Sequence, residues 1–80
     1  APAGQTDPAA GLEDRELGRA VREAVDALPE GQRVTFVLRH YQDLPLARIA
    51  EIRGVALGTV KAQLSQALGN LRRSLGGVRP

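Results

Sequence analysis

Gly54 separates two amphipathic segments, and this arrangement limits the fold more than any other feature of the chain. Apolar residues recur at helical spacing over residues 46–53 and again over residues 57–75. Glycine accepts a positive φ without steric penalty, so it can end the first helix and reverse the chain. Ala50 supplies a small side chain where two steeply crossing helices touch, with Val60 as its expected partner. The pattern predicts a helix-turn-helix.

Two further helices are expected before this unit, because apolar residues also recur at helical spacing on either side of Pro29. Proline ends one helix and is tolerated at the first position of the next. The chain shows no strand pattern, which predicts an all-α, four-helix domain with a helix-turn-helix and without wing elements. The expected helices are 12–27, 30–41, 46–53 and 57–75, with a flexible linker at 1–11, one domain over 12–75 and a tail at 76–80.

The expected core is small and aliphatic, since the 80 residues include one Phe, one Tyr and no Trp, Met or Cys. Without cysteine there is no disulfide framework, thiolate metal site or thiol nucleophile. No apolar run is long enough to span a membrane, and the amino terminus lacks the pattern of a signal peptide. These features predict a soluble, cytoplasmic protein.

The net charge of +2 hides an asymmetry between the two parts of the chain. Residues 1–30 carry a net charge of −4, whereas residues 31–80 carry +6. No Asp or Glu occurs after Glu51, although an exposed helix that serves only solubility usually mixes both signs. Lysine and arginine displace counterions from phosphate, so the basic part favours contact with nucleic acid. The expected outward face of the last helix is Thr59, Lys61, Ala62, Gln63, Ser65, Gln66, Gly69, Arg72 and Arg73.

Enzyme chemistry is not expected, because the reactive side chains lack partners. His40 is the only histidine, and no other residues stand at metal-ligand or acid–base spacing from it. Neither serine of the last helix has a nearby base, and the glycines form no phosphate-binding loop. We therefore expect no catalytic residue, no metal and no cofactor.

Several short motifs together resemble region 4 of bacterial sigma factors, and most closely the extracytoplasmic-function class. The resemblance covers about residues 12–75, and its more specific elements are an LP..QR entry at residues 28–33 and a GTVK step at residues 58–61. It implies a domain that binds the −35 promoter element through its last helix and docks on the β flap of RNA polymerase. Anti-sigma factors often cover such domains, so one is a possible partner.

Positions matched to the family imply specific roles. Arg39 is expected to reach the DNA backbone or the edge of the groove. The residues expected on or in the major groove are Thr59, Lys61, Ala62, Gln63, Ser65 and Gln66, and those expected in the core are Leu28, Val37, Leu38, Ile49, Val60 and Leu64.

The chain departs from the family pattern at the helix caps and on the recognition face. Pro45 and Ala56 replace hydroxyl residues that cap the third and fourth helices, and each lost cap costs on the order of 1 kcal/mol. Gln63 and Gln66 stand where the family often has arginine, which removes two cations that would contact DNA. Arg48, where an acid is common, compensates in part. We therefore expect weak DNA binding by the isolated domain.

Two alternatives remain open at this point. One is the DNA-binding output domain of a LuxR-type response regulator, which has a similar four-helix arrangement and a TVK-like step. The LP..QR entry and the long last helix favour a sigma factor instead. The other is a degenerate helix-turn-helix that acts only as a protein-interaction module, a hypothesis supported by Ala62, Gln63 and Gln66.

Overall fold

The computed structural model describes the backbone of residues 8–76 and the side chains of residues 15–76. This part of the chain contains four helices and no strand: α1 (Pro8–Asp26), α2 (Glu30–His40), α3 (Leu46–Arg53) and α4 (Leu57–Leu75). The prediction of an all-α, four-helix fold is therefore confirmed. Most of the expected linker and tail, residues 1–7 and 77–80, lies outside the described residues.

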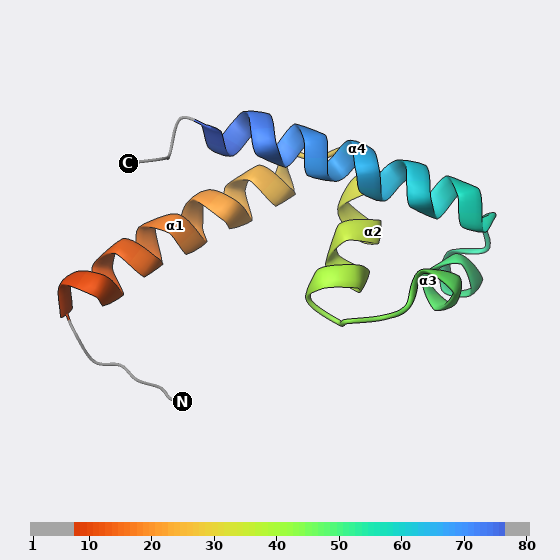
Figure 1. The fold of residues 1–80 in the computed structure, drawn as a ribbon, viewed down its shortest axis with the longest axis horizontal. Helices are drawn as coiled ribbons and strands as arrows, with labels where there is room; N and C mark the ends of the chain where they lie inside the picture. The colour runs from red at the N-terminus through yellow and green to blue at the C-terminus, as the bar shows by residue number, and fades with distance from the viewer. Residues whose placement is uncertain (1–7, 77–80) are drawn as a thin grey trace.

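Helix α4 is the element around which the others are arranged. It packs against each of the other three helices, and Figure 1 shows it running along one side of the molecule. Helix α1 lies near the carboxyl-terminal half of α4, α3 lies near its amino-terminal end, and α2 lies between them. The two ends of α4 therefore belong to different surroundings: the helix-turn-helix at one end and α1 at the other.

The main apolar core lies where α1, α2 and α4 meet. Partly buried aliphatic side chains surround it, including the expected core residues Val37 and Leu64. Leu38, also expected in the core, is half-buried. The buried members of this cluster are Ala24, Val25, Leu28, Phe36, Ala67 and Leu71.

Three of the expected helix bounds need correction, one of them the end of α1, which is Asp26 rather than Ala27. Helix α1 begins at Pro8 rather than Leu12, because proline is well suited to the first helical position and the two following alanines favour a helix. Helix α2 ends at His40, so Tyr41 is its carboxyl-terminal cap rather than a helical residue. Tyr41 is 56% exposed, whereas Phe36 is the buried aromatic side chain of this helix. The bounds of α3 and α4 are as predicted.

The turn between α3 and α4 is a Schellman motif centred on Gly54. Its φ is +69°, and its N–H donates to the carbonyl of Glu51 at 3.2 Å. The N–H of Val55 donates to the carbonyl of Ala50 at 3.1 Å, which completes the motif. The predicted left-handed glycine at the end of the third helix is thus confirmed.

A second, smaller buried region lies where α3 packs against α4. Ile49 from α3 and Val60 from α4 are both fully buried there, as predicted. Ala50 and Val55 are half-buried beside the turn. None of these four residues is part of the main apolar cluster, so the helix-turn-helix has its own small core.

Candidate nucleic-acid interface

Helix α4 begins without a side-chain cap. Ala56 precedes it with an extended backbone (φ −69°, ψ 151°), and no side chain accepts a hydrogen bond from the first turn. Pro45 precedes α3 in the same way. The expected absence of both caps is therefore confirmed. The first turn of α4 also holds no acidic residue, so nothing there offsets the positive end of the helix dipole.

The outward face of α4 is polar and basic, and several of its side chains are small. Thr59, Lys61, Ala62, Ser65 and Gln66 are exposed there, as expected. Small residues recur on this side of the helix at Gly58, Ala62 and Ser65, which are exposed, and at Gly69, which is half-buried. A helix with small side chains on one side can approach another surface closely.

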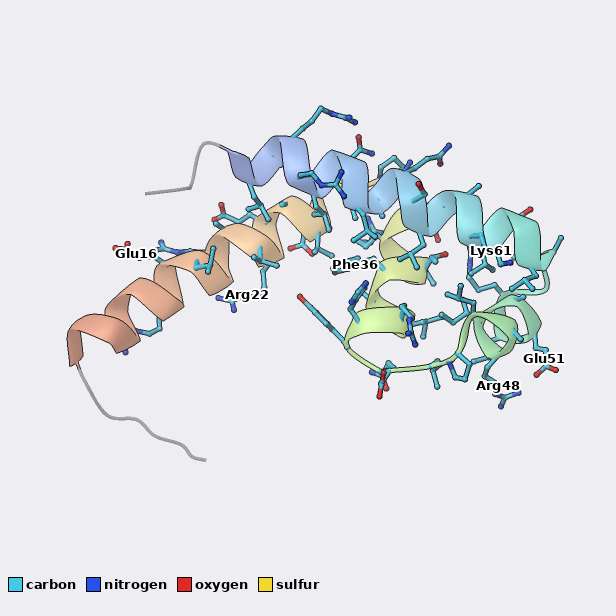
Figure 2. All side chains as sticks on the ribbon, in the orientation of Figure 1. Glu16, Arg22, Phe36, Arg48, Glu51 and Lys61 are labelled. Carbon is cyan, nitrogen blue, oxygen red and sulfur yellow. The ribbon has the colours of Figure 1, made fainter. Side chains whose placement is uncertain are left out.

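Lys61 and the helix-turn-helix occupy one end of the molecule. Figure 2 shows Lys61 on the part of α4 nearest α3, where α3 carries Arg48 and Glu51, whereas Glu16 lies midway along α1. Arg48 and Glu51 form an exposed ion pair of 3.0 Å within α3. Arg48 is thus partly neutralised by its own helix, and an exposed pair of this kind contributes little to stability.

Gln63 is half-buried at the edge of the outward face rather than fully exposed, and its contact with DNA stays a prediction. Its side-chain oxygen accepts hydrogen bonds from Thr35 at 3.3 Å and from the guanidinium of Arg53. The physical reason is the fully buried hydroxyl of Thr35, which needs polar partners in the space between α2 and α4. Residue 63 lies on the edge of the helix that faces this space.

Arg39 supports the loop between α2 and α3. Its guanidinium donates to the carbonyl of Leu44 at 3.0 Å and lies 3.9 Å from the carboxylate of Asp43. Asp43 has a φ of +57°, a conformation that aspartate tolerates better than most residues. With 40% of its side chain exposed, Arg39 can still present a donor to solvent. Contact between Arg39 and DNA stays a prediction.

A second set of polar side chains joins α2 to α4 next to Gln66. The amide of Asn70 donates to Gln32 at 2.7 Å, and Gln32 in turn lies 3.5 Å from the oxygen of Gln66. Arg73 donates to the oxygen of Asn70. Gln66 is therefore exposed, and the contact with Gln32 on α2 orients its side-chain amide.

Sequence reasoning missed the structural roles of Thr35, Arg53, Gln32 and Asn70. A threonine at a core-facing position of an amphipathic helix was the one available signal, because a buried hydroxyl needs a hydrogen-bond partner. The identity of those partners depends on how the helices pack.

The described part of the chain contains neither a cluster of metal-binding side chains nor a helix that could span a membrane. No three His, Asp or Glu residues of that part lie close enough to hold a metal ion. His40 packs its ring against Phe36, with centroids 4.5 Å apart. None of the helices over residues 8–76 is both long and apolar enough to cross a bilayer.

Comparison with known proteins identifies the family of this fold. Residues 18–71 match the family model described as sigma-70, region 4. The chain is 40% identical over 65 residues to the RNA polymerase sigma factor SigV of Bacillus subtilis, a match that covers 81% of this chain and 39% of that protein. It is 32% identical over 60 residues to the ECF RNA polymerase sigma factor SigW of the same organism, covering 75% and 32%. It is also 36% identical over 72 residues to the RNA polymerase sigma-E factor of Streptomyces antibioticus, covering 85% and 40%.

The chain thus spans about a third to two-fifths of the length of these relatives. The family match covers α2, α3, most of α4 and the second half of α1, which includes both the helix-turn-helix and the main core. The chain belongs to the family of sigma-70 region 4 domains.

Proposed function

We propose that this chain is the promoter-recognition domain of an extracytoplasmic-function type sigma factor and that α4 enters the major groove of the −35 element. The observation that carries the proposal is the exposed face of α4, which is basic at both ends and belongs to a segment without acidic residues after Glu51. A face of this kind is attracted to the phosphate backbone without repulsion from its own carboxylates.

The exposed side chains suit different parts of the DNA. Lys61 and the Arg72–Arg73 pair, all exposed, would neutralise phosphates on either side of the groove. Gln66 can pair with adenine through its amide, and the methyl group of Ala62 can contact the methyl group of thymine. Thr59 supplies a hydroxyl for a base edge or a phosphate.

The uncapped amino terminus of α4 also supports the proposal that this helix enters the major groove. Its free N–H groups and the positive end of the helix dipole suit a phosphate oxygen in place of a side-chain cap. The small residues at 58, 62 and 65 would let the helix lie deep in the groove. The free N–H groups and the small residues would each contact DNA in the complex. Binding of a phosphate would then take the place of the missing side-chain cap at Ala56.

Partners other than DNA follow from the same proposal. The β flap of RNA polymerase would dock on exposed apolar side chains outside α4, such as Leu17 on α1 and Tyr41 at the end of α2, which are 50% and 56% exposed. An anti-sigma factor would compete for these surfaces, and the site of action is the cytoplasm, where transcription occurs. No catalytic step is part of this role.

The isolated domain should bind DNA weakly. Gln63 is half-buried and bonded to Thr35 and Arg53, and both Gln63 and Gln66 are uncharged, so few cations face the groove. Each missing phosphate contact reduces both the affinity and its dependence on salt. Tethering by polymerase would raise the effective concentration of the domain at the promoter and offset the weak contacts.

The test measures two interactions separately: binding of the chain to a −35-type duplex and binding to the isolated β flap. The proposal expects both, with weak DNA binding that strengthens when polymerase carries the domain. Flap binding without any DNA binding, even in the complex with polymerase, would favour a protein-interaction module. DNA binding that requires dimerisation and occurs without the flap would favour a LuxR-type output domain.

A further inference from the structure

Three polar side chains from three helices meet beneath α4, and we refer to them as the polar bridge: Thr35 from α2, Arg53 from α3 and Gln63 from α4. Arg53 donates to the hydroxyl of Thr35 at 2.8 Å and also to the amide oxygen of Gln63. The Thr35 hydroxyl donates to the same oxygen of Gln63 at 3.3 Å. Each member is therefore bonded to the other two.

The first turn of α2 leaves room for the polar bridge. A β-carbon placed on Gly31 would lie 2.6 Å from the amide nitrogen of Gln63 and 3.4 Å from the guanidinium of Arg53. The first distance is too short for a real contact, so any larger residue at this position would displace Gln63. The glycine weakens the intrinsic stability of α2 and permits the close approach of all three helices.

The guanidinium of Arg53 bonds to neutral oxygens rather than to a carboxylate. Two ion pairs occur among the side chains of residues 15–76, and neither includes Arg53. Hydrogen bonds from a charged donor are stronger than those between neutral groups, and the guanidinium holds its donors in a fixed planar arrangement. Arg53 thus fixes the directions of its two acceptors as well as joining them.

Apolar packing alone constrains this part of the fold weakly. The main core is built from α1, α2 and α4, and α3 contributes only Ile49 as a fully buried apolar side chain. Apolar contacts have no preferred direction, so they fix the fine rotation of a helix about its own axis less closely than directional bonds do. Hydrogen bonds weaken steeply when their angles change.

We propose that the polar bridge sets the roll of α4 and thereby determines which of its side chains face the bases. Gln63 is then a positioning residue that contacts no base, although it lies within the recognition helix. This inference rests on the proposed function, because it concerns how the helix is presented to promoter DNA. It assigns base contacts to the exposed residues 59, 62, 65 and 66 and removes Gln63 from that set.

The test measures base preference at each position of the −35 element. A promoter library randomised over this element is selected for binding by the natural polypeptide that carries this chain, in complex with RNA polymerase core, and the bound DNA is sequenced. Arg53→Lys keeps the charge but loses the planar donors, and Gln63→Ala removes the shared acceptor. Gln63→Glu preserves the shape and adds a carboxylate opposite Arg53. Gln66→Ala is the matched control on the exposed face.

The polar bridge predicts that Arg53→Lys and Gln63→Ala each reduce base preference about tenfold, spread over several neighbouring positions, because the whole helix rolls. Gln66→Ala should reduce preference at one position. Gln63→Glu should keep the wild-type pattern and raise the melting temperature of the domain, because its carboxylate pairs with Arg53.

Two results would overturn the proposal. One is a change in base preference at a single position of the −35 element in Gln63→Ala, or no change in base preference in either Gln63→Ala or Arg53→Lys. The other is a new preference for cytosine at one position in Gln63→Glu, since glutamate accepts a hydrogen bond from the cytosine amine. Should Gln63→Ala fail to fold, Arg53→Lys and Gln63→Glu decide the question. A wild-type complex without any −35 preference would instead contradict the proposed function itself.

Discussion

The side-chain amide of Asn70 on α4 donates a 2.7 Å hydrogen bond to the side-chain oxygen of Gln32 on α2, and both residues are half-buried. This bond lies one to two helical turns beyond Gln63 and joins the same pair of helices. Helices α2 and α4 are therefore connected by polar contacts along one edge and by apolar packing along the other. Such an edge favours one relative orientation of the two helices.

Asn70→Ala should lower the free energy of unfolding by about 1 to 3 kcal/mol, because the half-buried oxygen of Gln32 loses its donor. Urea denaturation followed by circular dichroism measures this change. Ser74→Ala on the same helix is the control, since Ser74 is exposed and its replacement should change stability by less than ~0.5 kcal/mol. Equal effects of the two substitutions would show that the Asn70–Gln32 bond contributes nothing.

Ala56→Ser should raise the free energy of unfolding by about 1 kcal/mol. The backbone of residue 56 is already extended, so a serine hydroxyl can accept a hydrogen bond from the first turn of α4. Thermal unfolding of the chain checks this. Ala62→Ser, an exposed position within α4, provides the comparison and should be slightly destabilising, because serine has a lower helix propensity than alanine. A lower melting temperature in Ala56→Ser would contradict the cap argument.

Ile49→Ala should destabilise the domain by about 2 to 5 kcal/mol, since the side chain is fully buried and its removal leaves a cavity between α3 and α4. Ile52→Ala is a close control on the same helix, because Ile52 is 51% exposed and should lose far less. Chemical denaturation of both variants gives the comparison. Similar losses in the two variants would show that α3 does not pack on α4 as described.

Lys61→Ala should weaken binding to the −35 element nearly equally across DNA sequences and reduce the slope of log K against log salt by about one unit. The reason is the loss of one exposed cation on the outward face of α4. Footprinting with polymerase at several salt concentrations measures both quantities, alongside Gln66→Ala, which should alter sequence preference rather than salt dependence.

Arg19→Ala removes the same charge from an exposed position on α1, far from the proposed groove contact, and serves as the control for Lys61→Ala. It should leave the salt slope unchanged. A salt slope equally affected by Arg19→Ala would mean that the effect of Lys61 reflects net charge rather than contact.

The helix-turn-helix could be predicted from the sequence because its signals are local. Gly54 and the apolar periodicity on each side of it depend on backbone geometry and helical spacing, and both are encoded by neighbouring residues. The bounds of α3 and α4 accordingly match the expectation. The first helix was predicted to begin four residues too late, because the alanines after Pro8 carry no periodic pattern.

The orientation of Gln63 shows where sequence reasoning stopped. Helical spacing favours the outward face of α4 for residue 63, but the residue lies near the border with the inward face, where local rules alone do not decide the orientation of a side chain. Thr35 and Arg53 decide it, although they lie 28 and 10 residues away along the chain. A side chain at such a border turns toward whichever partners the tertiary packing brings within hydrogen-bond distance.

The sequence by itself thus determined the four helices, the left-handed turn at Gly54 and the acid-free character of the last helix, because each depends on composition or on residues close together in the chain. Only the tertiary structure decided that Gln63 faces inward, that Gln66 stays exposed and that Arg53 bonds to neutral partners. Those outcomes depend on how α2, α3 and α4 pack, and hydrogen bonds between distant residues form only after that packing is fixed.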